Sequence, residues 1–123
     1  VAHTANGAAS LRRSLDEFFP TRKRIFVLGF LQDKRIGEML RLLVRPQDRL
    51  ILTQAPTPRG ASLDQILQEL KPLPEIAANS LLTADPRDAL DQAERIASPR
   101  DLICVAGSLY LVGEIRTGLF LEK

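Results

Sequence analysis

The chain has 123 residues, enough for one compact domain, and its 45% hydrophobic and 26% charged content is ordinary for a globular protein. Seventeen Lys and Arg against 15 Asp and Glu give a net charge of +2, too weak to predict nucleic-acid binding. No apolar run is long enough to cross a membrane, no signal peptide is visible, and a single cysteine excludes an internal disulfide. We therefore expect a cytoplasmic protein.

Helical and strand patterns alternate along the chain. The expected elements, in chain order, are a helix over 8–19, a strand over 24–30, a helix over 36–44, a strand over 50–53, a helix over 63–70, a weak strand within 75–83, a helix over 86–97, a strand over 102–105 and a last helix from 108 onward. The run RIFVLGF at 24–30 is almost continuously apolar, which is typical of a strand covered on both faces.

Helix boundaries are marked by capping residues and prolines. Ser62 and Gln65 have capping-box spacing, Asp85 precedes a proline at the first helical position, and Asp33 is the expected N-cap of the 36–44 helix. Pro20 ends the first helix. Two apolar helix faces are expected to point into the core, with these members: Ala8, Leu11, Leu15, Phe18 and Phe19 in the first helix, and Leu63, Ile66, Leu67 and Leu70 in the third.

The alternation predicts an α/β fold: a Rossmann-like three-layer domain with a mostly parallel sheet between helices. Val1 and Ala2 would fit the end of one more strand, so we expect the chain to be a fragment that begins inside a structural unit. Ligands of such sheets gather beyond the carboxyl ends of the strands. This rule selects four short segments as candidate site: 3–4, 32–34, 53–60 and 106–108.

Each candidate residue also has an ordinary structural interpretation. Ser108, after Gly107, either caps a helix or offers its hydroxyl beside free N–H groups that bind an anion. Asp33 and Lys34 are either a cap and a solvated lysine or polar groups of a site. Arg59 is either a surface arginine or a cationic fork for a carboxylate.

Several chemistries are disfavoured by what the sequence lacks. His3 is the only histidine and has no suitably spaced partners, so no metal site is expected. There is no G-x-S-x-G motif for a serine hydrolase, and neither a G-x-x-x-x-G-K-[ST] loop nor a G-x-G-x-x-G motif for a nucleotide. Cys104 lies in an apolar strand pattern and is expected to be a buried structural thiol.

The run AGSLYLVGEIR at 106–116 resembles the last strand-to-helix signature of folylpolyglutamate synthases and bifunctional dihydrofolate/folylpolyglutamate synthases, within the Mur ligase superfamily. Residues 1–8 are similar to the family's D-G-A-H-N-P stretch, Asp33-Lys34 to its D-K pair and residues 57–59 to the N-P-R type of loop. The chain departs from the family in lacking the aspartate, which would precede Val1, and in having Thr4-Ala5 in place of Asn-Pro.

This resemblance implies that residues 1–123 are a single C-terminal domain, cut from an N-terminal ATPase domain that holds ATP and Mg²⁺. The complete enzyme, expected to be a monomer, would phosphorylate a folate or dihydropteroate carboxylate, and the amine of L-glutamate would then attack. The resemblance implies that His3 and Ser108 are catalytic, that Lys34, Arg59 and Ser108 bind the substrate, and that His3 and Asp33 lie near the nucleotide.

A second interpretation stays open at the level of sequence. The same fold could serve as a standalone Rossmann-like module that binds a small ligand or another protein without catalysis. In that case no ATPase domain would precede Val1 in the gene. Neither interpretation involves nucleic acid or a membrane, and the sequence does not distinguish the first addition of glutamate to dihydropteroate from later additions to folate.

Overall fold

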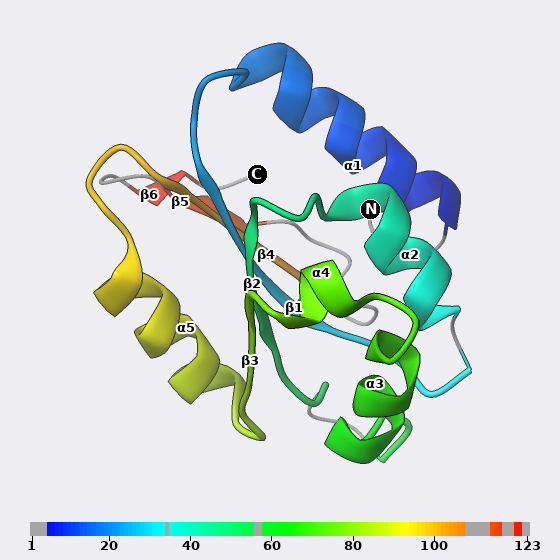
Figure 1. Cartoon of the computed structure of the whole chain (residues 1–123). Coiled ribbons are helices and arrows are strands. Elements are labelled where there is room, and N and C mark those ends of the chain that lie inside the picture. The colour runs from blue at the N-terminus through cyan, green and yellow to red at the C-terminus, as the bar shows by residue number, and fades with distance from the viewer. Residues whose placement is uncertain (1–4, 34, 56–57, 108–113, 117–119, 122–123) are drawn as a thin grey trace.

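A computed structural model describes residues 5–33, 35–55, 58–107, 114–116 and 120–121. Its core is one sheet with the strand order β3-β2-β1-β4-β5-β6. The strands β3, β2, β1 and β4 are parallel to one another, whereas β5 and β6 continue the sheet in antiparallel fashion. The prediction of a mostly parallel sheet flanked by helices is confirmed (Figure 1).

The described elements follow the expected alternation through the fourth strand. They are α1 (Ala5–Phe18), β1 (Arg24–Gly29), α2 (Ile36–Leu43), β2 (Arg49–Leu52), α3 (Leu63–Leu70), α4 (Pro74–Ala77), β3 (Ser80–Leu82), α5 (Pro86–Ile96), β4 (Leu102–Gly107), β5 (Glu114–Arg116) and β6 (Phe120–Leu121). The short helix α4 was not predicted. It begins at Pro74, a residue suited to the first turn of a helix. Its remaining residues belong to the 75–83 segment, for which only a weak strand is expected.

Side chains of the central strands alternate between two hydrophobic cores. Phe26 and Leu28 of β1 point into a large core with residues of α1, α2, α3 and α4, whereas Ile25 and Val27 point into a smaller core under α5. Figure 1 shows α5 on one side of the sheet and the other four helices on the opposite side. All six residues of β1 are buried, which explains why its sequence does not alternate between apolar and polar residues.

The end of the chain differs from the prediction. We expected a helix from Ser108 onward, but β5 and β6 form antiparallel strands there, and Ile115 of β5 pairs with Cys104 of β4. An apolar run this short fits either a helix or a strand, and pairing along β4 favours the strand. Residues 108–113 lie outside the described part of the chain.

Two residues expected in the core are exposed instead. Phe18 is 69% exposed and Leu67 46% exposed. Phe18 is the last residue of α1, where the chain turns away toward β1, and Phe19 takes the partly buried position against the core. In α3 the buried residues are Ile66 and Leu70, so a narrower apolar stripe than predicted faces the sheet.

Two buried arginines connect α1 to the rest of the domain. Arg12 donates through Nη1 to Asp48 Oδ2 at 2.7 Å and to the carbonyl oxygen of Leu43 at 3.0 Å. Arg24, at the start of β1, donates to Asp16 Oδ1 at 2.8 Å and to the carbonyl oxygens of Leu15 and Phe19 at 3.0 and 2.9 Å. These contacts satisfy carbonyl groups near the end of α1 and hold that helix on the sheet.

Candidate functional site

The carboxyl ends of β1 and β4 meet at the point where the strand order changes direction. The chain continues from β1 to β2 on one side, while β4 pairs with β1 on the other. Gly29 is in register with Gly107 at this edge. Two glycines side by side leave no side chains between the strand ends, which is the geometry that lets a ligand or a backbone approach closely.

Two loops that follow neighbouring strands are joined at this edge by backbone hydrogen bonds. The loop after β1 and the loop after β2 form an isolated antiparallel bridge between Leu31 and Gly60. Gln32 N donates to the carbonyl oxygen of Arg59 at 2.9 Å, and Ala61 N donates to the carbonyl oxygen of Phe30 at 2.8 Å. The 32–34 and 53–60 segments, both selected by the sequence, are therefore brought together.

Asp33 and Arg59 carry opposite charges on these two loops. Arg59 Nη2 lies 3.6 Å from Asp33 Oδ2, and the two side chains are 67% and 57% exposed. The prediction that Asp33 caps the next helix is wrong, because the N-cap residue of α2 is Arg35, whose side chain makes no capping hydrogen bond. The carboxylate of Asp33 faces the guanidinium of the adjoining loop instead.

Thr53 adds a buried hydroxyl directly after β2. Its backbone N–H donates to the carbonyl oxygen of Leu28 at 2.9 Å, which extends the parallel ladder by one residue. Thr53 is only 5% exposed, and its Oγ1 has no hydrogen-bond partner. A buried hydroxyl without a partner costs about 1–3 kcal/mol. Thr53 is the first residue of the 53–60 segment that the sequence selects, although no role was predicted for its hydroxyl.

Gly29 fixes how closely the loop after β2 approaches β1. A Cβ atom at this position would lie 3.3 Å from Ala55 N and 3.4 Å from the carbonyl oxygen of Thr53. Both contacts are to backbone atoms, which cannot rotate away as a side chain can. Glycine therefore allows the 53–55 segment to rest against the end of β1.

Three helix N-termini are already occupied by side chains of the domain. Glu69 of α3 accepts a hydrogen bond from Gly37 N of α2 at 3.0 Å, Ser62 Oγ accepts from Gln65 N at 3.1 Å, and Asp85 Oδ1 accepts from Arg87 N at 2.8 Å. The capping role predicted for Ser62 is confirmed, as is the start of a helix at Pro86, for which Asp85 is the N-cap. At each of these three N-termini, one backbone N–H is therefore already satisfied by a side chain.

The remaining candidate residues, His3, Lys34 and Ser108, lie outside the described residues, as does Tyr110. Within residues 5–33, 35–55, 58–107, 114–116 and 120–121, no cluster of three or more His, Cys, Asp or Glu side chains could hold a metal ion. In the same ranges, no helix is long and apolar enough to span a membrane. Cys104 is buried as predicted, and this burial raises the pKa of its thiol to about 12.

Comparison with known proteins identifies the family of this chain. The family described as "Mur ligase, glutamate ligase domain" matches residues 1–109, which is most of the chain. The chain belongs to this family. The resemblance noted in the sequence is thereby confirmed.

The individual relatives are folate enzymes. A curated relative in Haloferax volcanii, a probable bifunctional folylpolyglutamate synthase/dihydropteroate synthase, is 33% identical over 120 residues, covering 94% of this chain and 13% of that protein. A crystal structure of a bifunctional folylpolyglutamate synthase/dihydrofolate synthase from Yersinia pestis, complexed with AMPPNP and a Mn ion, is 29% identical with a TM-score of 0.74. It covers 90% of this chain and 25% of that one.

A further structure of such an enzyme, with Mn, AMPPNP and L-glutamate bound, is 27% identical with a TM-score of 0.71. It covers 88% of this chain and 24% of that chain. The chain thus spans about a quarter of the length of the enzymes of known structure and a smaller share of the curated relative. Homologues of this chain are ligases that bind a nucleotide and a divalent metal.

Proposed function

We propose that this chain is the glutamate-binding C-terminal domain of an ATP-dependent ligase that adds L-glutamate to folate or dihydropteroate. In the complete enzyme, the substrate carboxylate takes the γ-phosphoryl group of ATP and becomes an acyl phosphate. The amine of glutamate then attacks the carbonyl carbon, the C–O bond to phosphate breaks, and the amide, ADP and phosphate are the products. The amine loses a proton in this step.

The single observation that carries the proposal is the pairing of two loops at the carboxyl edge of the sheet. The Leu31–Gly60 bridge holds Asp33 and Arg59 beside the strand ends where Gly29 and Gly107 are in register. This is the edge at which ligands of open α/β sheets bind. The chain belongs to the glutamate ligase domain family, as the match to residues 1–109 shows. This membership supports glutamate as the ligand of that edge.

Arg59 is suited to bind a carboxylate of the incoming glutamate. Its guanidinium presents a planar fork of donors that matches a carboxylate. Its separation of 3.6 Å from Asp33 is longer than a hydrogen bond, and the pair is exposed. An ion pair of this kind contributes little free energy, so the contact between Arg59 and Asp33 is itself weak.

A second contribution of the domain is to exclude water. An acyl phosphate is hydrolysed readily, so a cleft closed between two domains protects it until the amine attacks. The carboxyl edge of this chain would form one wall of that cleft. His3, Lys34 and Ser108 remain predicted members of the site: His3 and Ser108 near the reacting groups, and Lys34 as a further cation for glutamate.

We assign the main contacts to ATP and the divalent metal to an N-terminal ATPase domain of the same enzyme. The described residues of this chain hold no cluster suited to a metal. Asp33 remains the one predicted contact to the nucleotide that the described residues contain. The isolated chain is accordingly expected to be inactive, and the complete enzyme to act in the cytoplasm as a monomer.

The test is the Michaelis constant for each substrate in the complete enzyme. Arg59→Gln should raise KM for L-glutamate at least 10-fold while changing KM for ATP by less than twofold, because one charged hydrogen-bond donor to glutamate is lost. The matched control is Arg13→Gln, which removes the same charge from an exposed position on α1. An unchanged KM for glutamate in Arg59→Gln, or an equal increase in Arg13→Gln, would contradict the proposal.

A further inference from the structure

A cavity opens at the amino ends of β1, β2 and β4, at the opposite edge of the sheet from the candidate site. Its volume is about 740 Å³, within the range of small-molecule sites. Its walls come from the segments that enter these three neighbouring strands: residues 20–25, 47–49 and 98–101, with Ile96 at the end of α5. The cavity therefore lies at the far end of the strands from the loops that carry Asp33 and Arg59.

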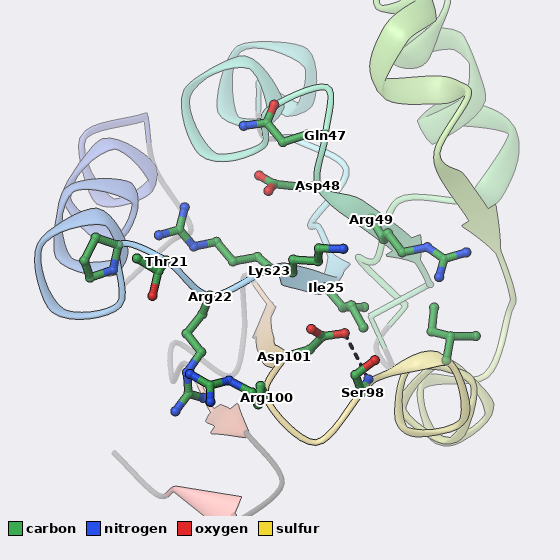
Figure 2. A pocket seen from close by; sticks show the side chains of 13 residues that line it. Thr21, Arg22, Lys23, Ile25, Gln47, Asp48, Arg49, Ser98, Arg100 and Asp101 are labelled. Carbon is green, nitrogen blue, oxygen red and sulfur yellow. Dashed lines mark hydrogen bonds between the residues drawn. The ribbon is translucent and has the colours of Figure 1, made fainter.

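The lining of this cavity has more positive than negative side chains. Its charged members are Arg22, Lys23, Arg24, Arg49 and Arg100 on the positive side and Asp48 and Asp101 on the negative side. Asp48 is already engaged by Arg12, and Arg24 by Asp16. Asp101 accepts a hydrogen bond from Ser98 N at 2.9 Å (Figure 2). Apart from these two pairs, the lining has four cations, Arg22, Lys23, Arg49 and Arg100, and one carboxylate, that of Asp101.

The guanidinium group of Arg22 gives independent evidence for a hydrogen-bond acceptor in this cavity. Its Nη1 atom is buried, yet has no hydrogen-bond partner. A buried guanidinium nitrogen without an acceptor is costly, and most such donors in folded proteins are satisfied. In Figure 2 the ends of the Arg22 and Arg100 side chains lie in the same part of the view, and both residues line the cavity.

We propose that this amino-edge cavity binds a small polyanion that carries at least two carboxylate or phosphate groups. One acid group would bind Arg22 and Arg100 and would give the buried Nη1 an acceptor. A second would be held by Lys23, with Arg49 as a further cation of the lining. Guanidinium groups bind carboxylate and phosphate oxygens through the same paired donors, so both chemistries fit.

The experiment is a calorimetric titration of the full chain with two probes, citrate and tripolyphosphate, at 0.15 M NaCl. At this ionic strength the Debye length is about 8 Å, so diffuse surface attraction is largely screened. We expect saturable binding of at least one probe with one site per chain. Binding of citrate alone identifies a carboxylate ligand, and binding of tripolyphosphate alone identifies a phosphate ligand.

Two substitutions test the location of the site. Arg22→Gln and Arg100→Gln should each weaken binding at least 10-fold, because each removes a charged donor. Arg100 is exposed, so its substitution keeps the test valid if Arg22→Gln fails to fold. Arg41→Gln, an equal change of charge at an exposed position on α2 outside the cavity, should change binding less than twofold.

Two results would overturn the proposal. One is the absence of saturable binding of either probe, and the other is a loss in Arg41→Gln as large as in Arg100→Gln, which would indicate non-specific attraction. The outcome is separate from that of the ligase proposal, because the titration uses neither glutamate nor ATP.

Discussion

Cys104 illustrates how the interior of this sheet controls the chemistry of a single side chain. The thiol is fully buried in β4, and burial raises its pKa to about 12, with Arg24 acting weakly in the opposite direction. The thiolate is the reactive form of cysteine. The thiol therefore stays protonated and inert over the physiological pH range.

We predict that a disulfide reagent such as DTNB does not modify the native chain at pH 8 but modifies one thiol per chain in 8 M urea. The single cysteine makes the absorbance change easy to interpret. Rapid stoichiometric modification of the native chain would contradict the prediction.

The raised pKa of Cys104 also predicts that the free energy of unfolding falls as the pH rises above 9, because the unfolded thiol then ionises while the buried one keeps its proton. Cys104→Ala should lessen this fall.

Single residues could be predicted from the sequence where their neighbours in the chain determine their environment. The burial of Cys104 follows from the apolar run around it, and the capping role of Ser62 follows from the spacing to Gln65. Asp33 could not be predicted in this way. Its partner Arg59 belongs to a loop that follows a different strand, and only the parallel sheet brings the two loops together.

At the scale of the element, helix α3 depends on the contact between its N-cap and its first turn. Ser62 Oγ accepts a hydrogen bond from Gln65 N at 3.1 Å, whereas the side chain of Gln65 donates to the carbonyl oxygen of Gln32 at 2.8 Å instead of returning to Ser62. The helix is thereby capped at one end and connected to the loop that carries Asp33.

Ser62→Ala should lower the free energy of unfolding by about 1 kcal/mol, the usual contribution of such a cap. Urea denaturation followed by circular dichroism measures the change. The matched control is Ser14→Ala, an exposed position within α1, where alanine favours the helix and a change below about 0.5 kcal/mol is expected. Equal losses in the two variants would show that the hydroxyl of Ser62 does not act as a cap.

The elements that were predicted correctly have strong local signals, and those that were missed lack them. The run at 24–30 and the amphipathic pattern at 36–44 identify β1 and α2. The sequence after β4 contains a short apolar stretch of ambiguous period, and its antiparallel pairing with β4 decides in favour of a strand.

At the scale of the whole molecule, the contact of Arg12 with Asp48 joins α1 to the segment between α2 and β2. Asp48 Oδ2 accepts from Arg12 Nη1 at 2.7 Å and from Arg45 N at 2.9 Å, and the side chains of Arg12 and Asp48 are only 8% and 5% exposed. Removal of the Asp48 charge would leave the buried Arg12 with the ion pair that its Nε makes to Asp16 at 3.3 Å, whose side chain is 49% exposed.

Asp48→Asn should therefore lower the free energy of unfolding by about 3 kcal/mol. Chemical denaturation of the full chain measures this, and Asp91→Asn, at an exposed position on α5, is the control, with an expected change below about 0.5 kcal/mol. A denaturation midpoint for Asp48→Asn equal to that of the control would show that the pair is not a significant source of stability.

The architecture as a whole could be read from the alternation of elements, because parallel strands connected by helices admit few arrangements. The carboxyl edge could be selected as the site for the same reason, and two of its segments do come together. The amino-edge cavity could not be selected, since its cations are scattered along the sequence and only the three strand starts assemble them.

The backbone bridge between Leu31 and Gly60 has a mechanical consequence. Because backbone hydrogen bonds join the two loops, a displacement of Arg59 is expected to carry the segment of Asp33 with it. In the proposed enzyme, a glutamate carboxylate bound by Arg59 would therefore reposition both loops together.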